Sequence, residues 1–428
     1  MKTIVLCVFL CMNLALAQSN QISGVVSDSA THEALPYATI RLSGTPRGTI
    51  SNSNGEFLMD VDSFPATVIV SYIGYGTDSM IVGSPEQARN LQINLERQEI
   101  TMPEVVVNLS DTYAADLVKK VYKKIRSDNN VVTDGKAFYR AYASVNSNYT
   151  EIFEMFLDAL LDDRGITDAT VEQGRYAKAK FEGKYKLYVT VTNLLFFSTN
   201  TFKLSQTGYS FFSFLPFVKK AIAYVPIRED AEKYFYLRTN GFYQSSDGGV
   251  AIIQFSPKPD LDRPAVSGTM EIDTTTDDVL RIKEEVNDSR FKPFDFHYMG
   301  YYLSDFTLSY NARFVRDASG NNRLSFLGTQ LSFDGKNDSN LTFVEHFSYS
   351  TLLTFYEYGN KSEFRPKTER DEKNDLVSIM NAKYDPEFWK RHQGIINEIP
   401  IEQSVKESFI KHGFYGNLFP GGEPLNEK

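Results

Sequence analysis

The sequence predicts a mainly β protein, with an N-terminal seven-stranded Greek-key β-sandwich, a large antiparallel β-sheet domain and a few helices. Aromatic residues make up 14 % of the 428 residues, with 25 Tyr and 32 Phe, and this composition suits antiparallel sheets. Short β-prone runs recur between turn signals at near-regular intervals, which is typical of sandwiches and meanders. The length allows two or three domains at roughly 100 to 200 residues each.

The N-terminus predicts export. Met1-Lys2 is followed by an apolar run and by Ala15-Leu16-Ala17, which is the architecture of a signal peptide cleaved near Ala17. Both cysteines, Cys7 and Cys11, lie inside this segment, so we expect neither a disulfide nor a thiolate site in the mature chain. Leu precedes each cysteine, which argues against a lipoprotein. We expect a location in the periplasm or at the outer membrane.

Net charge and hydropathy limit which classes of partner we expect the chain to bind. The formal net charge is −9, which disfavours nucleic acid and general affinity for anionic lipid. After the signal, no run of about 18 apolar residues occurs, so we expect no transmembrane helix. The predicted organisation is a signal peptide (1–17), the sandwich (18–107), a helix plus β-rich domain (108–380) and a C-terminal helical tail (381–428).

The sandwich is predicted from seven short β-prone runs with alternating side chains. These runs are Ile22–Ser27, Tyr37–Leu42, Arg47–Ser51, Phe57–Val61, Thr67–Ile73, Asp78–Val82 and Leu91–Leu95.

The stretch from Gly44 to Phe57, GTPRGTISNSNGEF, could be half of a calcium loop or a turn. An EF-hand-type loop needs a carboxylate at its first position and a Glu at its twelfth, and these positions hold Ile50 and Val61. We therefore expect no calcium site. Asn54-Gly55 instead predicts a type I′ turn that joins two strands as a hairpin.

Five motifs in this region together carry a family resemblance. They are Gly24-x-Val26-x-Asp28, Leu35-Pro36-Tyr37-Ala38-Thr39-Ile40, Gly44-Thr45-x-x-Gly48-Thr49, Asn54-Gly55-x-Phe57 and Tyr72-x-Gly74-Tyr75. In this order they resemble the carboxypeptidase regulatory-like domain, a transthyretin-type sandwich, over Gln21 to Val107. The resemblance implies a non-catalytic docking module. Similar modules precede the plug and barrel of TonB-dependent receptors in Bacteroidota, so an accessory role in such uptake is one alternative.

The second domain is predicted to begin with a helix after Ser110 and to continue as an antiparallel meander. Its expected strands are Ala137–Val145, Tyr234–Arg238, Val250–Phe255, Val266–Ile272, Val279–Val286, Tyr301–Tyr310, Leu324–Phe333 and Leu341–Tyr349. A transmembrane barrel is the rival interpretation, but the strand count is low for it and the chain ends on polar residues. Two pieces resemble parts of uncharacterised Bacteroidota envelope proteins that pair this sandwich with a β-rich domain: Ser267–Asp273 followed by Val279–Ile282, and Tyr384–Trp389. The sheet distantly resembles the half-barrel of periplasmic lipoprotein carriers.

Catalytic motifs are missing from the sequence. There is no His-x-x-Glu pair, Gly-x-Ser-x-Gly elbow, Walker loop or dinucleotide fingerprint, and the five His residues are widely spaced. Two aspartate clusters could serve acid/base chemistry or bind Ca²⁺, but turn formation explains them better. They are Asp158, Asp162 and Asp163, and Asp273, Asp277 and Asp278. We predict no catalytic residue, no cofactor and no metal ligand. A hydrolase that uses scattered carboxylates stays as an alternative.

The segment from Leu194 to Val218 is the richest in phenylalanine, and Lys203 is its one charged residue. It either fills the core of the sheet, or it lines an apolar groove or rests on a membrane. Its candidate binding residues are Phe211, Phe212, Phe214 and Phe217. The sequence thus favours an exported, non-enzymatic envelope protein whose β-rich domain binds an apolar ligand, such as a lipid, or a protein partner.

Overall fold

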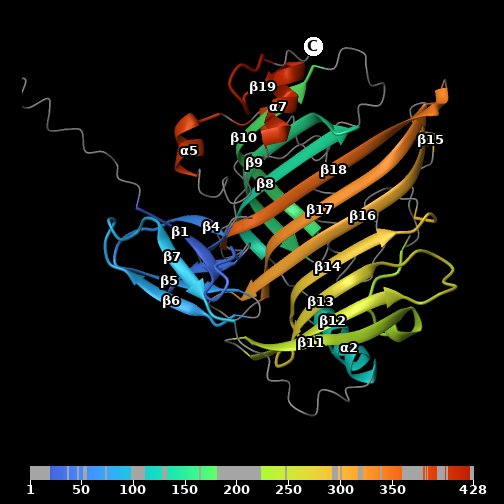
Figure 1. The fold of residues 1–428 in the computed structure, drawn as a ribbon, viewed down its shortest axis with the longest axis horizontal. Coiled ribbons are helices and arrows are strands. Elements are labelled where there is room, and N and C mark those ends of the chain that lie inside the picture. Colours follow the sequence, from blue (N-terminus) through green and yellow to red (C-terminus); the bar gives the residue numbers. More distant parts are fainter. Residues whose placement is uncertain are drawn as a thin grey trace, which may run out of the picture.

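Two β structures follow one another in the computed structural model of the chain: a two-sheet sandwich and one large antiparallel sheet (Figure 1). The predicted mainly β fold is confirmed. The structure describes residues 20–35, 38–45, 48–51, 55–72, 75–97, 111–127, 133–162, 165–180, 223–245, 248–291, 297–298, 301–316, 322–337, 340–358, 379–380, 382, 384–392, 401 and 403–424.

The sandwich has the seven predicted strands, divided between a sheet of order β4-β1-β7 and a sheet of order β3-β2-β5-β6. Alternate residues of these strands are buried, and their apolar side chains form one core between the sheets. β1 pairs with β7 in parallel. The Greek-key connection stays a prediction. The strands are β1 (Gln21–Asp28), β2 (Thr39–Leu42), β3 (Gly48–Ile50), β4 (Glu56–Asp60), β5 (Ala66–Ser71), β6 (Asp78–Val82) and β7 (Leu91–Leu95).

The expected hairpin at Asn54-Gly55 is wrong. The strands on either side of it, β3 and β4, belong to different sheets, so the chain crosses the sandwich here. Gly55 does have the positive φ that we expected, at +75°. Its backbone carbonyl accepts a hydrogen bond from the Val26 N–H at 2.8 Å, which ties the crossing to β1. The local turn chemistry was therefore recognised, but not the sheet that the next strand joins.

Asp28 holds one end of the sandwich together. Its carboxylate accepts hydrogen bonds from the Tyr75 hydroxyl and the Arg97 Nε–H, both at 2.6 Å, and from the backbone N–H groups of Ala30 and Thr31. The Tyr75 hydroxyl, followed by the Thr31 N–H, keeps the pKa of Asp28 well below its usual range. The Gly24-x-Val26-x-Asp28 and Tyr72-x-Gly74-Tyr75 motifs thus meet through a buried carboxylate.

The large sheet has the order β11-β12-β13-β14-β16-β17-β18-β8-β9-β10-β19, and every neighbouring pair is antiparallel. The run from β11 to β18 follows the predicted meander, but Ala137–Val145, expected as its first strand, is part of β8 and pairs with β18 and β9. The strands are β8 (Thr133–Val145), β9 (Asn148–Asp162), β10 (Gly165–Ala179), β11 (Phe235–Ser245), β12 (Gly248–Pro257), β13 (Ser267–Asp273), β14 (Val279–Asn287), β15 (His297–Tyr298, paired with β16), β16 (Tyr301–Arg316), β17 (Asn322–Asn337), β18 (Asn340–Tyr358) and β19 (Phe414–Gly416).

Within the described ranges, the helices beside the large sheet are α2, α5, α7 and a short 3-10 helix. The predicted helix is α2 (Asp111–Ser127), which packs against β11 (Figure 1). The segment expected as a helical tail contains α5 (Pro386–Arg391) and α7 (Gln403–His412), and it also supplies the edge strand β19. The 3-10 helix η3 (Ala231–Lys233) precedes β11. The boundaries predicted for the domains stay predictions.

The sandwich adjoins the large sheet through polar contacts. Arg41 on β2 donates from Nη1 to the Arg316 carbonyl at 3.4 Å, and Gln21 on β1 donates to the Arg391 carbonyl at 3.3 Å. Arg316 in turn binds Asp273 and Asp278 at 2.8 and 3.1 Å. The sandwich therefore contacts the end of β16, next to the turn that joins β13 and β14, and also the end of α5.

Replacing Gly55 by Val should destabilise the sandwich strongly. A Cβ at this position would lie 2.4 Å from the Val26 carbonyl oxygen, and the backbone has a positive φ. Gly44 offers a matched control, because its φ is +74° but a Cβ there meets nothing within 4 Å. We expect Gly44→Val to cost about 1 to 3 kcal/mol from backbone strain. Gly55→Val should cost clearly more in urea unfolding, and equal losses would contradict the clash.

Candidate functional site on the inner face of the large sheet

The two faces of the large sheet differ in chemistry. The inner face carries rows of directly opposed side chains that cross six strands, from β14 to β9, through β16, β17, β18 and β8. One row is Ile282, Ala312, Leu327, Leu353, Tyr139 and Met155, and another is Val286, Leu308, Leu331, Tyr349, Ala143 and Glu151. The opposite side of the same strands is the outer face.

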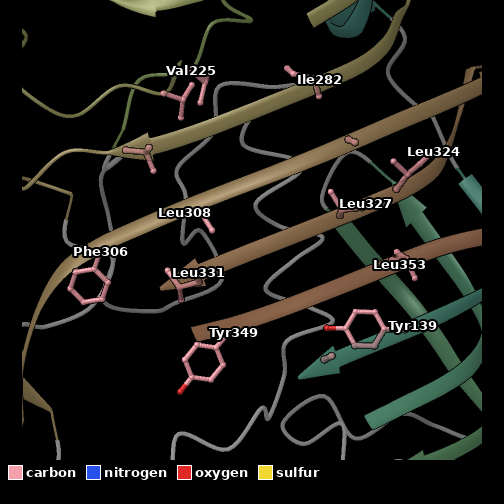
Figure 2. Close-up of a cluster of buried hydrophobic side chains, with 14 of the residues drawn as sticks. Tyr139, Val225, Ile282, Phe306, Leu308, Leu324, Leu327, Leu331, Tyr349 and Leu353 are labelled. Carbon is pink, nitrogen blue, oxygen red and sulfur yellow. The ribbon is translucent and has the colours of Figure 1, made fainter. Parts of the chain in front are cut away.

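The inner-face rows are almost wholly apolar and buried. Figure 2 shows Leu308, Leu331 and Tyr349 projecting from neighbouring strands, and all three side chains are less than 10 % exposed. Fully burying one such side chain contributes about 1.5 to 3 kcal/mol, so the rows stabilise the sheet as its core. They also form the kind of surface that lines sites for apolar ligands.

Aromatic rings gather at one end of this face. Phe333 lies at the centre, with ring centroids 5.2 Å from Phe306, 5.2 Å from Phe347 and 5.9 Å from Tyr349. Tyr301 meets the edge of Phe347 at 6.2 Å. These separations are those of favourable aromatic pairs. The cluster joins β16, β17 and β18 on the inner face.

A buried carboxyl group lies beside this aromatic cluster. Glu345 is 4 % exposed, and its Oε2 has no hydrogen-bond partner among the described residues. Burial raises the pKa of Glu345, although a hydrogen bond from Tyr301 partly opposes the rise. Burial, and then the nearby Glu151, also raises the pKa of the Tyr349 hydroxyl well above its ordinary value. The inner face thus disfavours negative charge.

Where α5 covers β8, β9 and β10, the outer face carries buried charged groups, unlike the apolar rows of the inner face. Arg140 and Arg175 each bind one oxygen of the buried Glu154 carboxylate at 2.6 Å. Burial alone would raise the pKa of Glu154, but the two guanidinium groups hold it below its ordinary value. Phe156 packs against the Trp389 ring of α5, and Arg175 lies 4.2 Å from the centre of that ring. This ion triad attaches α5 to the sheet.

The structure accounts for one of the predicted Asp clusters as a turn. Asp273 accepts hydrogen bonds from the backbone N–H groups of Thr275 and Thr276, and its carboxylate and that of Asp278 both bind Arg316. Lys124 of α2 also forms an ion pair with Asp278. These carboxylates link elements of the fold. In the other cluster, Asp162 ends β9 and the side chains of Asp162 and Asp163 lie outside the described residues.

The histidines that the structure describes serve separate contacts. His392 stacks on Phe388 with ring centroids 4.0 Å apart, and His346 bonds to Asp334 on the sheet surface. Among the described residues, no group of three or more His, Cys, Asp or Glu could hold a metal ion. No described helix is long and apolar enough to cross a membrane.

The candidate binding residues Phe211, Phe212, Phe214 and Phe217 lie outside the described residues, as does the rest of Leu194 to Val218. Whether this segment is core or groove therefore stays a prediction. Sequence analysis missed Glu345. A signal existed, because Glu345 has the same strand parity as Phe347 and Tyr349, and a carboxylate in phase with buried aromatic residues is unusual.

The comparison with protein families confirms the resemblance of the N-terminal region. Residues 22–107 match the model of the CarboxypepD_reg-like domain. The sandwich is therefore a carboxypeptidase regulatory-like domain, and the rest of the chain lies outside this match. No curated protein sequence matches the chain.

Solved structures show weak likeness to the chain. A DUF1329 family protein from Desulfovibrio piger is 7 % identical, with 59 % of this chain and 95 % of that chain covered and a TM-score of 0.23. The MucA/MucB complex of Pseudomonas aeruginosa is 10 % identical, with 56 % of this chain and 93 % of that chain covered and a TM-score of 0.19. A LolA superfamily protein from Nitrosomonas europaea is 8 % identical, with 59 % of this chain and 98 % of that chain covered and a TM-score of 0.18. Likeness at these TM-scores carries no argument about function.

Replacing Glu345 by Gln should stabilise the protein at neutral pH. Because the pKa of Glu345 is raised in the folded state, the wild type loses stability as pH rises through that pKa. The variant has no such loss, so the difference in free energy of unfolding between variant and wild type should grow from pH 4 to pH 8. It should reach about 1 kcal/mol, which is the usual cost of leaving a buried polar group unpaired. Urea unfolding at both pH values measures this.

Glu285→Gln changes an exposed residue on the outer side of β14 and is the matched control. It should leave the free energy of unfolding unchanged at both pH 4 and pH 8. A Glu345→Gln protein that is less stable at pH 8 than the wild type would show that Glu345 is ionised and paired.

Proposed function

We propose that the chain is an exported, non-catalytic binding protein of the bacterial envelope, in the periplasm or at the outer membrane. Its β-rich domain would bind an apolar ligand, such as a lipid, or a protein partner. The carboxypeptidase regulatory-like sandwich would serve as a docking module. The observation that carries the proposal is the set of apolar rows that cross six strands on the inner face of one sheet.

Charge supports an apolar occupant of the inner face. Glu345 lies beside the aromatic cluster and Glu151 lies near Tyr349, and burial disfavours the charged forms of Glu345 and Tyr349. A neutral or aliphatic group adds no further desolvation cost there. An anionic group would have to approach these carboxylates. The face therefore suits alkyl chains or apolar side chains better than charged ligands.

The contacts of Asp273, Asp278 and Glu154 favour structural over catalytic roles for these three carboxylates. General acid/base catalysis needs a carboxyl group that is free to exchange a proton with a substrate. Asp273 and Asp278 instead share Arg316, and Glu154 is enclosed between two arginines. These groups are held as charged structural partners.

The proposal is tested on Phe211, Phe212, Phe214 and Phe217, by replacing all four with Ser. If they line the binding site, the variant should stay folded, with an unchanged circular dichroism spectrum, and lose uptake of a fluorescent fatty-acid probe. If they are core residues, each loss costs about 3 to 5 kcal/mol and the domain unfolds. Native mass spectrometry of the wild type from its own envelope would detect a co-purifying lipid or protein.

The control replaces Tyr302 and Val344 by Ser, because both are exposed apolar residues, at 44 % and 41 %, on the outer face. It should bind the probe as the wild type does. The proposal fails if three results coincide: the wild type takes up no probe, no lipid or protein partner co-purifies with it, and the quadruple variant unfolds.

A further inference from the structure

A third row of directly opposed residues crosses the inner face, between the two apolar rows. Thr329 on β17 and Thr351 on β18 lie at its centre, and they face one another across the two strands. The leucines and the tyrosine that flank them on the same face belong to the apolar rows, and Figure 2 shows them. The whole row is Glu284, Tyr310, Thr329, Thr351, Ala141 and Phe153.

Both threonine hydroxyl groups are buried without a hydrogen bond. Thr329 is 5 % exposed and Thr351 is 7 % exposed, and neither Oγ1 atom has a partner in the part of the chain that the structure describes. Opposed side chains have Cβ atoms about 4.5 to 5.5 Å apart, so opposed hydroxyl groups can bond to one another. Thr307 and Ser332 do so on the outer face of β16 and β17, with 2.6 Å between their oxygen atoms. The inner-face pair does not.

The unpaired hydroxyl groups are unfavourable for the fold alone. The large majority of buried polar side-chain atoms have a hydrogen-bond partner, because leaving one unpaired costs free energy. Valine would occupy either position without that cost, and it has a high preference for strands. Departures from such folding rules concentrate at functional sites. The two threonines therefore mark the place on the inner face where a ligand supplies the missing partner.

Two hydroxyl donors at this spacing fit one oxygen acceptor. Hydrogen bonds between oxygen atoms are about 2.7 to 2.8 Å long, so an oxygen atom midway between two groups about 5 Å apart is within reach of both. The acceptor should be uncharged, because burying a charge among apolar side chains is costly. The carbonyl oxygen of an ester meets both requirements, and an alkyl chain attached to it suits the apolar rows.

We propose that the hydroxyl groups of Thr329 and Thr351 bind the carbonyl oxygen of a fatty acyl ester on the inner face of the large sheet. This inference rests on the function proposed above, and it names the class of apolar ligand as a neutral lipid ester. Both hydroxyl groups donate to the carbonyl oxygen, and the apolar rows on either side contact the acyl chain.

Competition against a fluorescent fatty-acid probe tests this site on the mature chain. The competitors are methyl palmitate and octadecane, which have chains of the same length and differ in the ester group. Methyl palmitate should displace the probe from the wild type at a concentration about tenfold lower than octadecane, which is the scale of two hydrogen bonds. In the double variant Thr329→Val and Thr351→Val, the ester should bind more weakly and the two competitors should become nearly equal.

Thr354→Val is the matched control. Thr354 is also a buried threonine of β18, at 5 %, but its hydroxyl group donates to the Ser325 carbonyl at 3.3 Å on the outer face. This variant should keep the wild-type preference for the ester. Without ligand, Thr329→Val and Thr351→Val should each melt at or above the wild-type temperature, because an unpaired buried hydroxyl group is removed. Thr354→Val should melt below it, because a hydrogen bond is lost.

Equal displacement of the probe by the ester and the alkane in the wild type would overturn the ester site and leave the proposed apolar binding intact. A wild type that takes up no probe would overturn this inference together with lipid binding. The ester site is also overturned if the double variant keeps the preference for the ester. Single variants at Thr329 and Thr351 that melt below the wild type, with that preference kept, would assign the two hydroxyl groups a structural role.

Discussion

The pairing of β18 with β8 is the contact on which the large sheet depends. It joins the last strand of the meander to the first strand of the domain, from Phe347 opposite Val145 to Tyr358 opposite Gly135. Without it, β8, β9 and β10 would separate from β11 to β18, and the inner-face rows would be cut between Leu353 and Tyr139. Because the partners are far apart in sequence, the loop between them must close before the pairing contributes stability.

This pairing also decides how each face is used. The two apolar rows run without interruption from β14 to β9, and the buried polar residues Glu284, Thr329 and Thr351 lie between them on the inner face. On the outer face, β8 and β9 are covered by α5 through Phe388 and Trp389, whereas β14 and β16 keep charged side chains there. One sheet therefore has both faces buried at one side and a single face buried at the other.

Sequence analysis predicted the strands that are buried on one face better than those that are buried on both. The strands with one solvent-facing side, such as β14 and the part of β17 from Leu327 onward, show alternation and were predicted. Strand β9 was missed because its residues from Glu151 to Leu157 are all buried, with Met155 on the inner face and Phe156 under α5, so no alternation marks it. The hairpin at Gly55 was wrong because a turn signal is local, whereas sheet membership is set by tertiary packing. Likewise, sequence spacing could not show that Arg281 faces Arg313.

Two arginine pairs on the outer face show how strand register decides whether neighbouring charges compensate one another. Glu154 lies between Arg140 and Arg175 in the strand order, so each guanidinium receives its own carboxylate oxygen at 2.6 Å. In the other pair, Glu271 lies at the end of the row, and Arg281 and Arg313 face one another with no carboxylate between them. The first arrangement compensates its charges internally and carries the packing of α5. The second places two like charges directly opposite one another, which is an unfavourable cross-strand pair.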